Sequence, residues 1–275
     1  MTVVSEDNSN SNPPEIIQFD ELAKISGESA QWQRIMSLDA EKQLDVYLDL
    51  KSPHAYLAVR PSLEVARDYR VRVNFLPFTL SYEALGLTTS VEPDMKRRPP
   101  SASADRKARM YYAAAREYAT LQGLPFRTPH RLLDSELAHK SFLFAKKQNL
   151  EVPFIMHVYL HGWGSGWRTY ELESTIHLQK SLVAAGADLD GFDEFVAVGG
   201  VGEKELERCM QDALASGYAG VPHFVLFDTA AQRQLGLFGR EHLALIRGKY
   251  HEEGLARSEH VRPEFSHAWR GPEAE

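Results

Sequence analysis

The most constraining feature of this sequence is a strand–helix–strand pattern over residues 44–77. Residues 44–50 alternate apolar and polar side chains, which predicts a strand, and residues 71–77 form a second predicted strand. Between them, Ser52 and Pro53 combine a preferred N-cap residue with the preferred first helical residue, so a helix should begin there. A helix of this length suits a right-handed crossover between parallel strands. The sequence therefore predicts an α/β fold that begins with a βαβ unit.

Helix signals dominate the chain until two further short strands. Residues 81–215 are almost entirely helical in pattern. Short apolar strands follow at 223–227 and around 234–238, and a last helix begins after Gly239. The order is therefore βαβ, a helical insertion, then ββα. It divides the chain into an N-terminal tail with extra helices (1–43), an α/β domain (44–80 plus 216–250), an inserted helical domain (81–215) and a C-terminal tail (251–275).

The two ends of the chain have their own patterns. Residues 1–14 are rich in Asn, Ser and Pro and predict a disordered tail. Apolar residues recur near helical spacing between residues 15 and 40, which predicts one or two packing helices. Residues 251–275 are polar and should either wrap the surface or remain loose.

Charge and cysteine content exclude several function classes. The chain has 31 Lys and Arg against 38 Asp and Glu, a net charge of −7, which argues against a duplex-DNA binder. One cysteine, Cys209, excludes an intrachain disulfide framework, a CxxC dithiol and an iron–sulfur site. Cys209 lies on a predicted apolar helix face and should be inert core.

Targeting and metal signals are also missing from the sequence. Its first residues show no secretion signal, and no apolar run is long enough to cross a bilayer, so we expect a cytoplasmic protein that binds neither membrane nor nucleic acid. The 11 histidines include no HExxH motif and no pair at ligand spacing backed by a carboxylate, so we expect no metal site.

A series of motifs carries a family resemblance over residues 44–250. The segment SPHAYLA at residues 52–58 resembles the SPYAYLA segment of 2-hydroxychromene-2-carboxylate isomerases and of the related kappa-class glutathione transferases. Together with the element order, this resemblance implies a thioredoxin fold of the DsbA-like branch, with a helical domain inserted between its halves. Further matches occur in the family's order: Lys107-Ala108-Arg109, Gly123-Leu124-Pro125-Phe126 with Pro129, Tyr159 with Trp163 and Gly166, Gly220-Val221-Pro222, and residues 238–243.

The resemblance implies glutathione as cofactor and gives Ser52 a catalytic role. Ser52 stands where thioredoxins keep their attacking cysteine, at a helix N-terminus whose free N–H groups favour negative charge. With no cysteine there, the expected anion is the glutathione thiolate, which the hydroxyl would stabilise by a hydrogen bond. The alternative is that Ser52 only caps the helix, which is worth about 1 kcal/mol.

His54 replaces the tyrosine usual in the family's SPY segment. A neutral imidazole beside the thiolate would be able to shuttle a proton, which gives His54 a catalytic role. Equally, His54 can be a partly buried helix residue whose ring is satisfied by its surroundings.

Further cofactor-binding residues are implied by the resemblance. Pro222 is expected to follow a cis peptide bond, and Val221 would then pair with the backbone of the glutathione cysteine in a strand-like manner. Lys107 matches the family's lysine that meets the glycyl carboxylate. The neighbouring loop departs from the family, because Leu87 stands where an asparagine is usual.

Arg240 and Glu241 occupy the positions where kappa-class transferases carry Ser-Asp, the pair that holds the γ-glutamyl end of glutathione. Glu241 would still pair with the α-ammonium. The longer Arg240 would either bind the α-carboxylate or block it. The alternative for both is an exposed pair of charges in the first turn of a helix.

The second substrate should bind between the two domains, where ligand pockets commonly form. Trp163 and Trp167 flank the segment 164–166, which suits a bend that holds aromatic rings over an apolar substrate, although aromatic residues are more often core. The expected lining residues are His54, Tyr82, Tyr111, Tyr112, Trp163 and Trp167.

The leading functional hypothesis is a glutathione-dependent isomerase of aromatic keto-acids, acting in aromatic catabolism. As the resemblance implies, the thiolate adds to the conjugated substrate, permits bond rotation and is eliminated, so glutathione is not consumed. A kappa-like transferase or peroxidase would instead consume glutathione. A third hypothesis is a non-catalytic binding protein on this fold, favoured by the departures at Arg240 and Leu87. Family members commonly form homodimers, so we expect a dimer.

Overall fold

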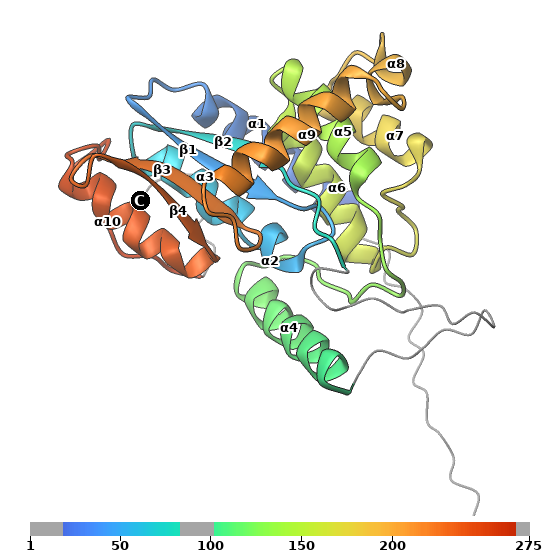
Figure 1. Cartoon of the computed structure of the whole chain (residues 1–275), viewed down its shortest axis with the longest axis horizontal. Coiled ribbons are helices and arrows are strands. Elements are labelled where there is room, and N and C mark those ends of the chain that lie inside the picture. Colours follow the sequence, from blue (N-terminus) through green and yellow to red (C-terminus); the bar gives the residue numbers. More distant parts are fainter. Residues whose placement is uncertain (1–18, 83–101, 268–275) are drawn as a thin grey trace, which may run out of the picture.

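The structure is a computed structural model that describes residues 19–82 and 102–267 (Figure 1). The tail expected at residues 1–14, the departure at Leu87 and the last residues of the C-terminal tail lie outside the described residues. In the part described, no helix is long and apolar enough to cross a membrane.

A four-stranded mixed sheet forms the centre of the α/β domain (Figure 1). Strands β1 (Lys42–Leu48) and β2 (Val71–Pro77) are parallel, as the βαβ pattern predicted. Strand β3 (His223–Asp228) runs antiparallel to β1, and β4 (Arg233–Phe238) antiparallel to β3. The strand order β2-β1-β3-β4 confirms the thioredoxin fold.

The crossover helix is divided in two, which the sequence analysis did not predict. Helix α2 (Pro53–Tyr56) is only four residues long, and α3 (Val59–Asp68) begins three residues after its end. Pro61 explains the division, because proline has no N–H for the carbonyl four residues earlier and its ring crowds that carbonyl. That carbonyl, on Leu57, instead accepts a hydrogen bond of 2.9 Å from the Gln122 side chain. The result is a short, separately oriented first turn at Ser52.

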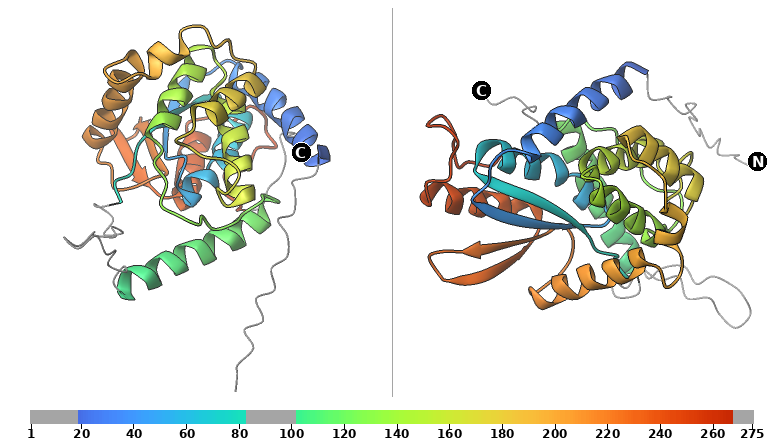
Figure 2. Two further views of the ribbon diagram at one scale, coloured as in Figure 1. Left: turned by 90° about the vertical axis from the view of Figure 1, so that its right-hand side faces the viewer. Right: turned by 90° about the horizontal axis from the view of Figure 1, so that it is seen from above.

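Among the described residues, six helices lie between β2 and β3: α4 (Ala102–Leu121), α5 (Glu136–Lys147), α6 (Glu151–Ser165), α7 (Thr175–Ala185), α8 (Phe192–Val196) and α9 (Val201–Ala215). Helices α5 to α8 gather at one end of the sheet, whereas α4 lies apart from them and next to α2 (Figures 1 and 2). Helix α4 is therefore placed to form one wall around the start of α2.

The helices at both ends of the described chain pack against the rest of the fold. Helix α1 (Phe19–Met36) is one helix that continues through Gly27 and packs on α3 and α6. Trp32 is fully buried, and Glu28 forms a buried ion pair of 2.8 Å with Arg60 of α3. The last helix, α10 (Leu243–Glu252), is preceded by a 3₁₀ turn, η1 (Arg240–His242).

After α10 the described chain packs along the surface, which is one of the two alternatives that the sequence left open. The Arg70 N–H donates to the Leu255 carbonyl at 2.9 Å, and the Arg257 N–H donates to the Asp68 carbonyl at 2.9 Å. These contacts hold residues 255–257 against the start of β2 and the end of α3. The chain then continues toward α4, where His267 contacts Tyr118.

Cys209 of α9 is buried, as predicted, and burial raises the pKa of its thiol to about 11. Because the thiolate is the nucleophile, we expect the folded protein to react with a thiol reagent at pH 8 at least tenfold more slowly than the protein unfolded in guanidinium. Following the colour change of an aromatic disulfide reagent measures both rates. Equal rates would show that Cys209 is not protected.

Candidate functional site

Ser52 lies at the carboxyl end of β1 and is the N-cap of α2. Its Oγ accepts a hydrogen bond of 3.3 Å from the Ala55 N–H, and its own N–H donates to the Asp49 carbonyl at 2.9 Å. Accepting the Ala55 N–H leaves the Ser52 O–H available to donate to a ligand. The residue therefore serves as the cap, and its hydroxyl proton remains free for the expected thiolate.

A buried polar network under Ser52 was not found from the sequence, and Asp49 is its centre. One Asp49 carboxylate oxygen accepts the Lys51 N–H at 3.0 Å and the Ser135 hydroxyl at 2.7 Å and lies 3.3 Å from the His139 imidazole. The other accepts the Leu80 N–H at 2.7 Å and lies 3.6 Å from the Lys51 ammonium. Asp49 and His139 are fully buried.

Asp49 keeps its charge in this position. Burial acts to raise the pKa of Asp49, but His139, Lys51 and the Leu80 N–H together outweigh burial and hold that pKa below its ordinary value. A strand-end aspartate followed by Ser-Pro was the only sequence signal for this network, since Ser135 and His139 come from α5 and its approach. The network fixes the chain between Asp49 and Ser52.

His54, on α2, faces α4 and the start of α10. Its ring meets the Tyr111 ring edge-on with centroids 5.6 Å apart, and its Nε2 is buried without a hydrogen-bond partner among the described residues. Burial and the positive charge of Arg240 lower the pKa of His54, against an opposing effect of Glu241, so the imidazole is neutral at pH 7. Within the described part of the chain Nε2 of His54 is unsatisfied, which favours the ligand-facing alternative.

Arg240 lies on η1, in the region that His54 faces. It is buried, so it is not one of a pair of exposed charges in the first turn of a helix, which was the alternative from the sequence. Its side chain is 6% exposed, and its Nε and Nη1 have no hydrogen-bond partner among the described residues. The guanidinium lies 4.2 Å from the centroid of the Tyr118 ring on α4. Burial lowers the pKa of Arg240 to about 10, so it remains charged at pH 7.

Glu241 and Lys107 lie at the more exposed part of the same region. The Glu241 carboxylate folds back over Gly239, where an added Cβ would come within 2.6 Å of both its oxygens. Gly239 also has a φ of 110°, which favours glycine. The Lys107 ammonium is exposed and lies 5.8 Å from the Tyr111 ring, so α4 brings it to the His54 side of the site.

The Val221–Pro222 peptide bond is cis, as the resemblance implied. Pro222 stands immediately before β3, and its carbonyl accepts the Gly239 N–H at 3.0 Å. This hydrogen bond ties the start of β3 to the start of η1. The backbone next to Val221 and the backbone next to Arg240 are therefore joined directly by this hydrogen bond.

Tyr82 and Tyr112 lie on the Lys51 side of Ser52. The Tyr82 hydroxyl accepts the Leu133 N–H at 3.2 Å, and the Lys51 ammonium lies 4.9 Å from the centre of its ring. Burial raises the pKa of both phenols, so each is protonated at pH 7. Their half-buried rings are available as candidate substrate contacts, with the exposed Tyr111 ring on the other side.

Trp163 and Trp167 are core residues, contrary to the expected substrate-lining role. Both are fully buried, and Trp163 is stacked against Tyr56 and Phe126, with ring planes within 10° of parallel. A Cβ at Gly162 would lie 2.3 Å from the Trp167 ring, so the glycine makes room for that indole. Gly162 therefore serves interior packing, and the sequence pattern did not distinguish a buried pair of tryptophans from a substrate-covering bend.

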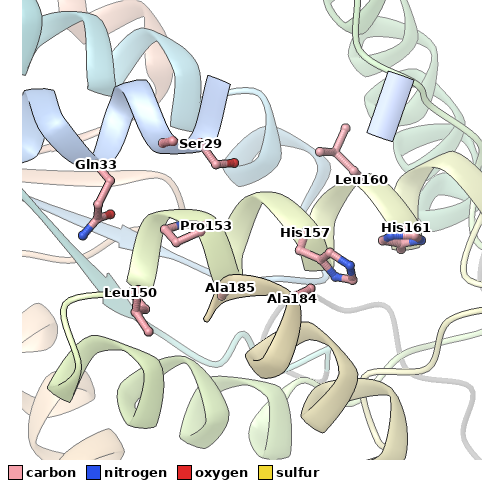
Figure 3. Close-up of a pocket in the computed structure, with 10 residues that line it drawn as sticks. Ser29, Gln33, Leu150, Pro153, His157, Leu160, His161, Ala184 and Ala185 are labelled. Carbon is pink, nitrogen blue, oxygen red and sulfur yellow. The ribbon is translucent and has the colours of Figure 1, made fainter. Parts of the chain in front are cut away.

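A cavity of about 390 Å³ lies elsewhere, between α1, α6 and α7 (Figure 3). Gln33 lines it from α1, and His157 and His161 line it from α6. Burial and His161 lower the pKa of His157 to about 4, so this imidazole is neutral at pH 7. Of the sequence-predicted site residues that the structure describes, none lines this cavity, so it is separate from the Ser52 site.

A model of the DsbA-like thioredoxin domain matches residues 43–251. This chain belongs to the DsbA-like thioredoxin family. No curated protein matches its sequence. Residues before 43 and after 251, including α1 and the segment that carries His267, fall outside the match of this DsbA-like chain to its family.

Solved structures share the fold at low identity. A 2-hydroxychromene-2-carboxylate isomerase is 19% identical, with a TM-score of 0.60 over 77% of this chain and 96% of that one. A probable DsbA oxidoreductase from Streptomyces coelicolor is 17% identical, with a TM-score of 0.58 over 81% and 93%. The cytosolic disulfide reductase DsbM from Pseudomonas aeruginosa is 17% identical, with a TM-score of 0.53 over 77% and 97%. At such identities the likeness shows the fold alone.

Proposed function

We propose that this protein is a glutathione-dependent isomerase of aromatic keto-acids. Its family includes isomerases and oxidoreductases, and one structural neighbour is a 2-hydroxychromene-2-carboxylate isomerase. Dithiol chemistry at the start of α2 is excluded, because Ser52 stands there and Cys209, the only cysteine, is buried in α9. In the proposed reaction the thiol therefore comes from a bound molecule.

The observation that carries the choice of glutathione is the buried guanidinium of Arg240. A buried cation with two guanidinium nitrogens that lack partners among the described residues favours an anionic ligand, and arginine binds carboxylates and phosphates through paired hydrogen bonds. Glu241 follows directly and offers a negative charge for an ammonium group. An arginine beside a glutamate suits the free amino-acid end of glutathione, which carries a carboxylate and an ammonium.

Three groups of the chain would act at the reacting end. The Ser52 O–H donates to the sulfur, and the N–H groups of the first turn of α2 add their favourable field for negative charge. Neutral His54 holds or returns the thiol proton through its unpartnered Nε2. Bound glutathione would supply a thiolate that adds reversibly to the conjugated double bond of the substrate. Tyr82, Tyr111 and Tyr112 provide aromatic surface for that substrate.

The test is calorimetric titration with reduced glutathione. We expect the wild-type protein to bind, and the Arg240→Ala variant to bind about 10- to 100-fold more weakly, since a charge-assisted hydrogen bond contributes about 1.5–3 kcal/mol. Arg233→Ala, at an exposed position of β4, is the matched control and should bind like the wild type.

Three outcomes would overturn parts of this proposal. No binding at millimolar glutathione would remove the cofactor and with it the isomerase. Unchanged affinity in Arg240→Ala would remove Arg240 from the binding site. Binding accompanied by stoichiometric loss of the thiol during turnover would replace the isomerase with a kappa-like transferase or peroxidase.

A further inference from the structure

We propose that His267, in the segment after α10, is a further binding residue of the Arg240 subsite and donates a hydrogen bond to the carboxylate of the bound amino-acid end. This inference rests on the proposed function, because it names one more contact for the same ligand. It concerns a segment that the family match, which ends at residue 251, does not include.

Tyr118 of α4 brings Arg240 and His267 together. The Tyr118 ring has the Arg240 guanidinium 4.2 Å from its centroid and the His267 ring 4.6 Å from it, centroid to centroid. Phe265 holds the imidazole from another side, with ring centroids 4.7 Å apart. The segment therefore places the His267 ring against Tyr118 of α4, which also contacts Arg240 of η1.

Unpartnered polar atoms in this region come from three separate elements. They are Nε2 of His54 on α2, Nε and Nη1 of Arg240 on η1, and Nδ1 of His267, each buried without a hydrogen-bond partner among the described residues. Buried polar groups are normally paired, so a group of four unpaired atoms requires an explanation. The Arg240 and His267 atoms can each donate to a carboxylate, which has enough acceptor sites for several such donors, whereas Nε2 of His54 is the atom proposed above to hold the thiol proton.

Electrostatics agrees with this grouping. Burial and then the charge of Arg240 lower the pKa of His267, with Glu241 acting in the opposite direction, the same pair of charges that acts on His54. Both imidazoles thus lie within the field of one guanidinium. In the free protein this field opposes a positive charge on either ring, and a bound carboxylate would offset it.

The experiment compares three variants by titration with reduced glutathione. We expect His267→Ala to weaken binding about tenfold, the effect of one hydrogen bond to a charged group. His267→Asn places an amide N–H near the position of Nδ1 and should recover most of the affinity. His260→Ala is the matched control, since His260 is an exposed histidine of the same segment, and it should bind like the wild type.

A second ligand separates a binding role from a structural one. Cysteinylglycine lacks the γ-glutamyl group, so His267→Ala and the wild type should bind it equally. Equal affinities of His267→Ala and the wild type for glutathione would overturn the role of His267 and leave the proposed function standing. A similar loss for both ligands would show a structural role only and would also overturn this inference. Failure of the wild type to bind glutathione would overturn both proposals.

Discussion

Replacing Ser52 by alanine is expected to lower the rate of glutathione-dependent isomerisation by about 10²- to 10³-fold, the usual cost of losing one donor to a developing or stabilised anion. Oγ accepts the Ala55 N–H through a lone pair, so this contact leaves the hydroxyl proton to donate to the sulfur. The measurement follows interconversion of the two isomers of a conjugated aromatic keto-acid by absorbance, with glutathione at catalytic concentration.

Ser174 provides a matched control for the loss of the cap. Ser174 is the N-cap of α7, and its Oγ accepts the His177 N–H, so Ser174→Ala removes the same kind of hydrogen bond far from the site in sequence. Each alanine variant should lose about 1 kcal/mol of stability, but only Ser52→Ala should lose activity. Ser52→Thr retains a hydroxyl and should retain more activity than the alanine variant. An undiminished rate in Ser52→Ala would remove Ser52 from the mechanism.

Replacing Asp49 by alanine is expected to have the largest effect on stability. The side chain accepts three hydrogen bonds inside the protein and faces Lys51 and His139, so its removal leaves buried donors without an acceptor. Breaking such a buried charged group costs about 3–5 kcal/mol. For a chain of this size that lowers the melting temperature by roughly 6–20 °C, which differential scanning fluorimetry measures.

The pH dependence of this effect follows from the lowered pKa of Asp49. A carboxyl whose pKa is lower in the folded state stabilises the protein above its unfolded pKa of about 3.9, and that contribution is lost as the pH falls through the folded value. Asp49→Asn should therefore be clearly less stable than the wild type at pH 7, with the difference shrinking below about pH 4. A constant difference across this range would contradict the ionised network.

Asp45 on the same strand is the control for this prediction. Its carboxylate is half-buried and accepts hydrogen bonds only from the Gln43 and Asn74 side chains among the contacts described. Surface hydrogen bonds of this kind contribute about 1 kcal/mol, so Asp45→Ala should shift the melting temperature far less than Asp49→Ala.

The sequence was most informative where periodicity is local. Alternation over β1 and β2 and the Ser-Pro start of α2 were sufficient for the βαβ unit, and the cis bond before Pro222 followed from the family motif. The division between α2 and α3 also has a local signal in the sequence, because Pro61 has no N–H to donate to the Leu57 carbonyl.

The parts that sequence analysis missed depend on long-range contacts. Asp49 meets His139 across 90 residues, and Arg240 meets Tyr118 across more than 100, so no spacing rule could bring them together. The predicted substrate-lining role of Trp163 and Trp167 was wrong for a related reason. Their composition suits both a pocket and a core, and only the packing of Tyr56 and Phe126 on Trp163 decides between the two.

Helix α3 is contacted both by the N-terminal helix α1 and by the segment that follows α10. Glu28 of α1 pairs with Arg60 near the start of α3, and the backbone N–H and guanidinium of Arg257 donate to the carbonyls of Asp68, Ala66 and Asp39 around its end. A protein shortened to residues 43–251, the bounds of the family match, would lose both sets of contacts with α3. It would also expose the surface that Trp32 covers. The two terminal additions thus form part of one folded unit, and we expect deletion of either to lower the free energy of unfolding.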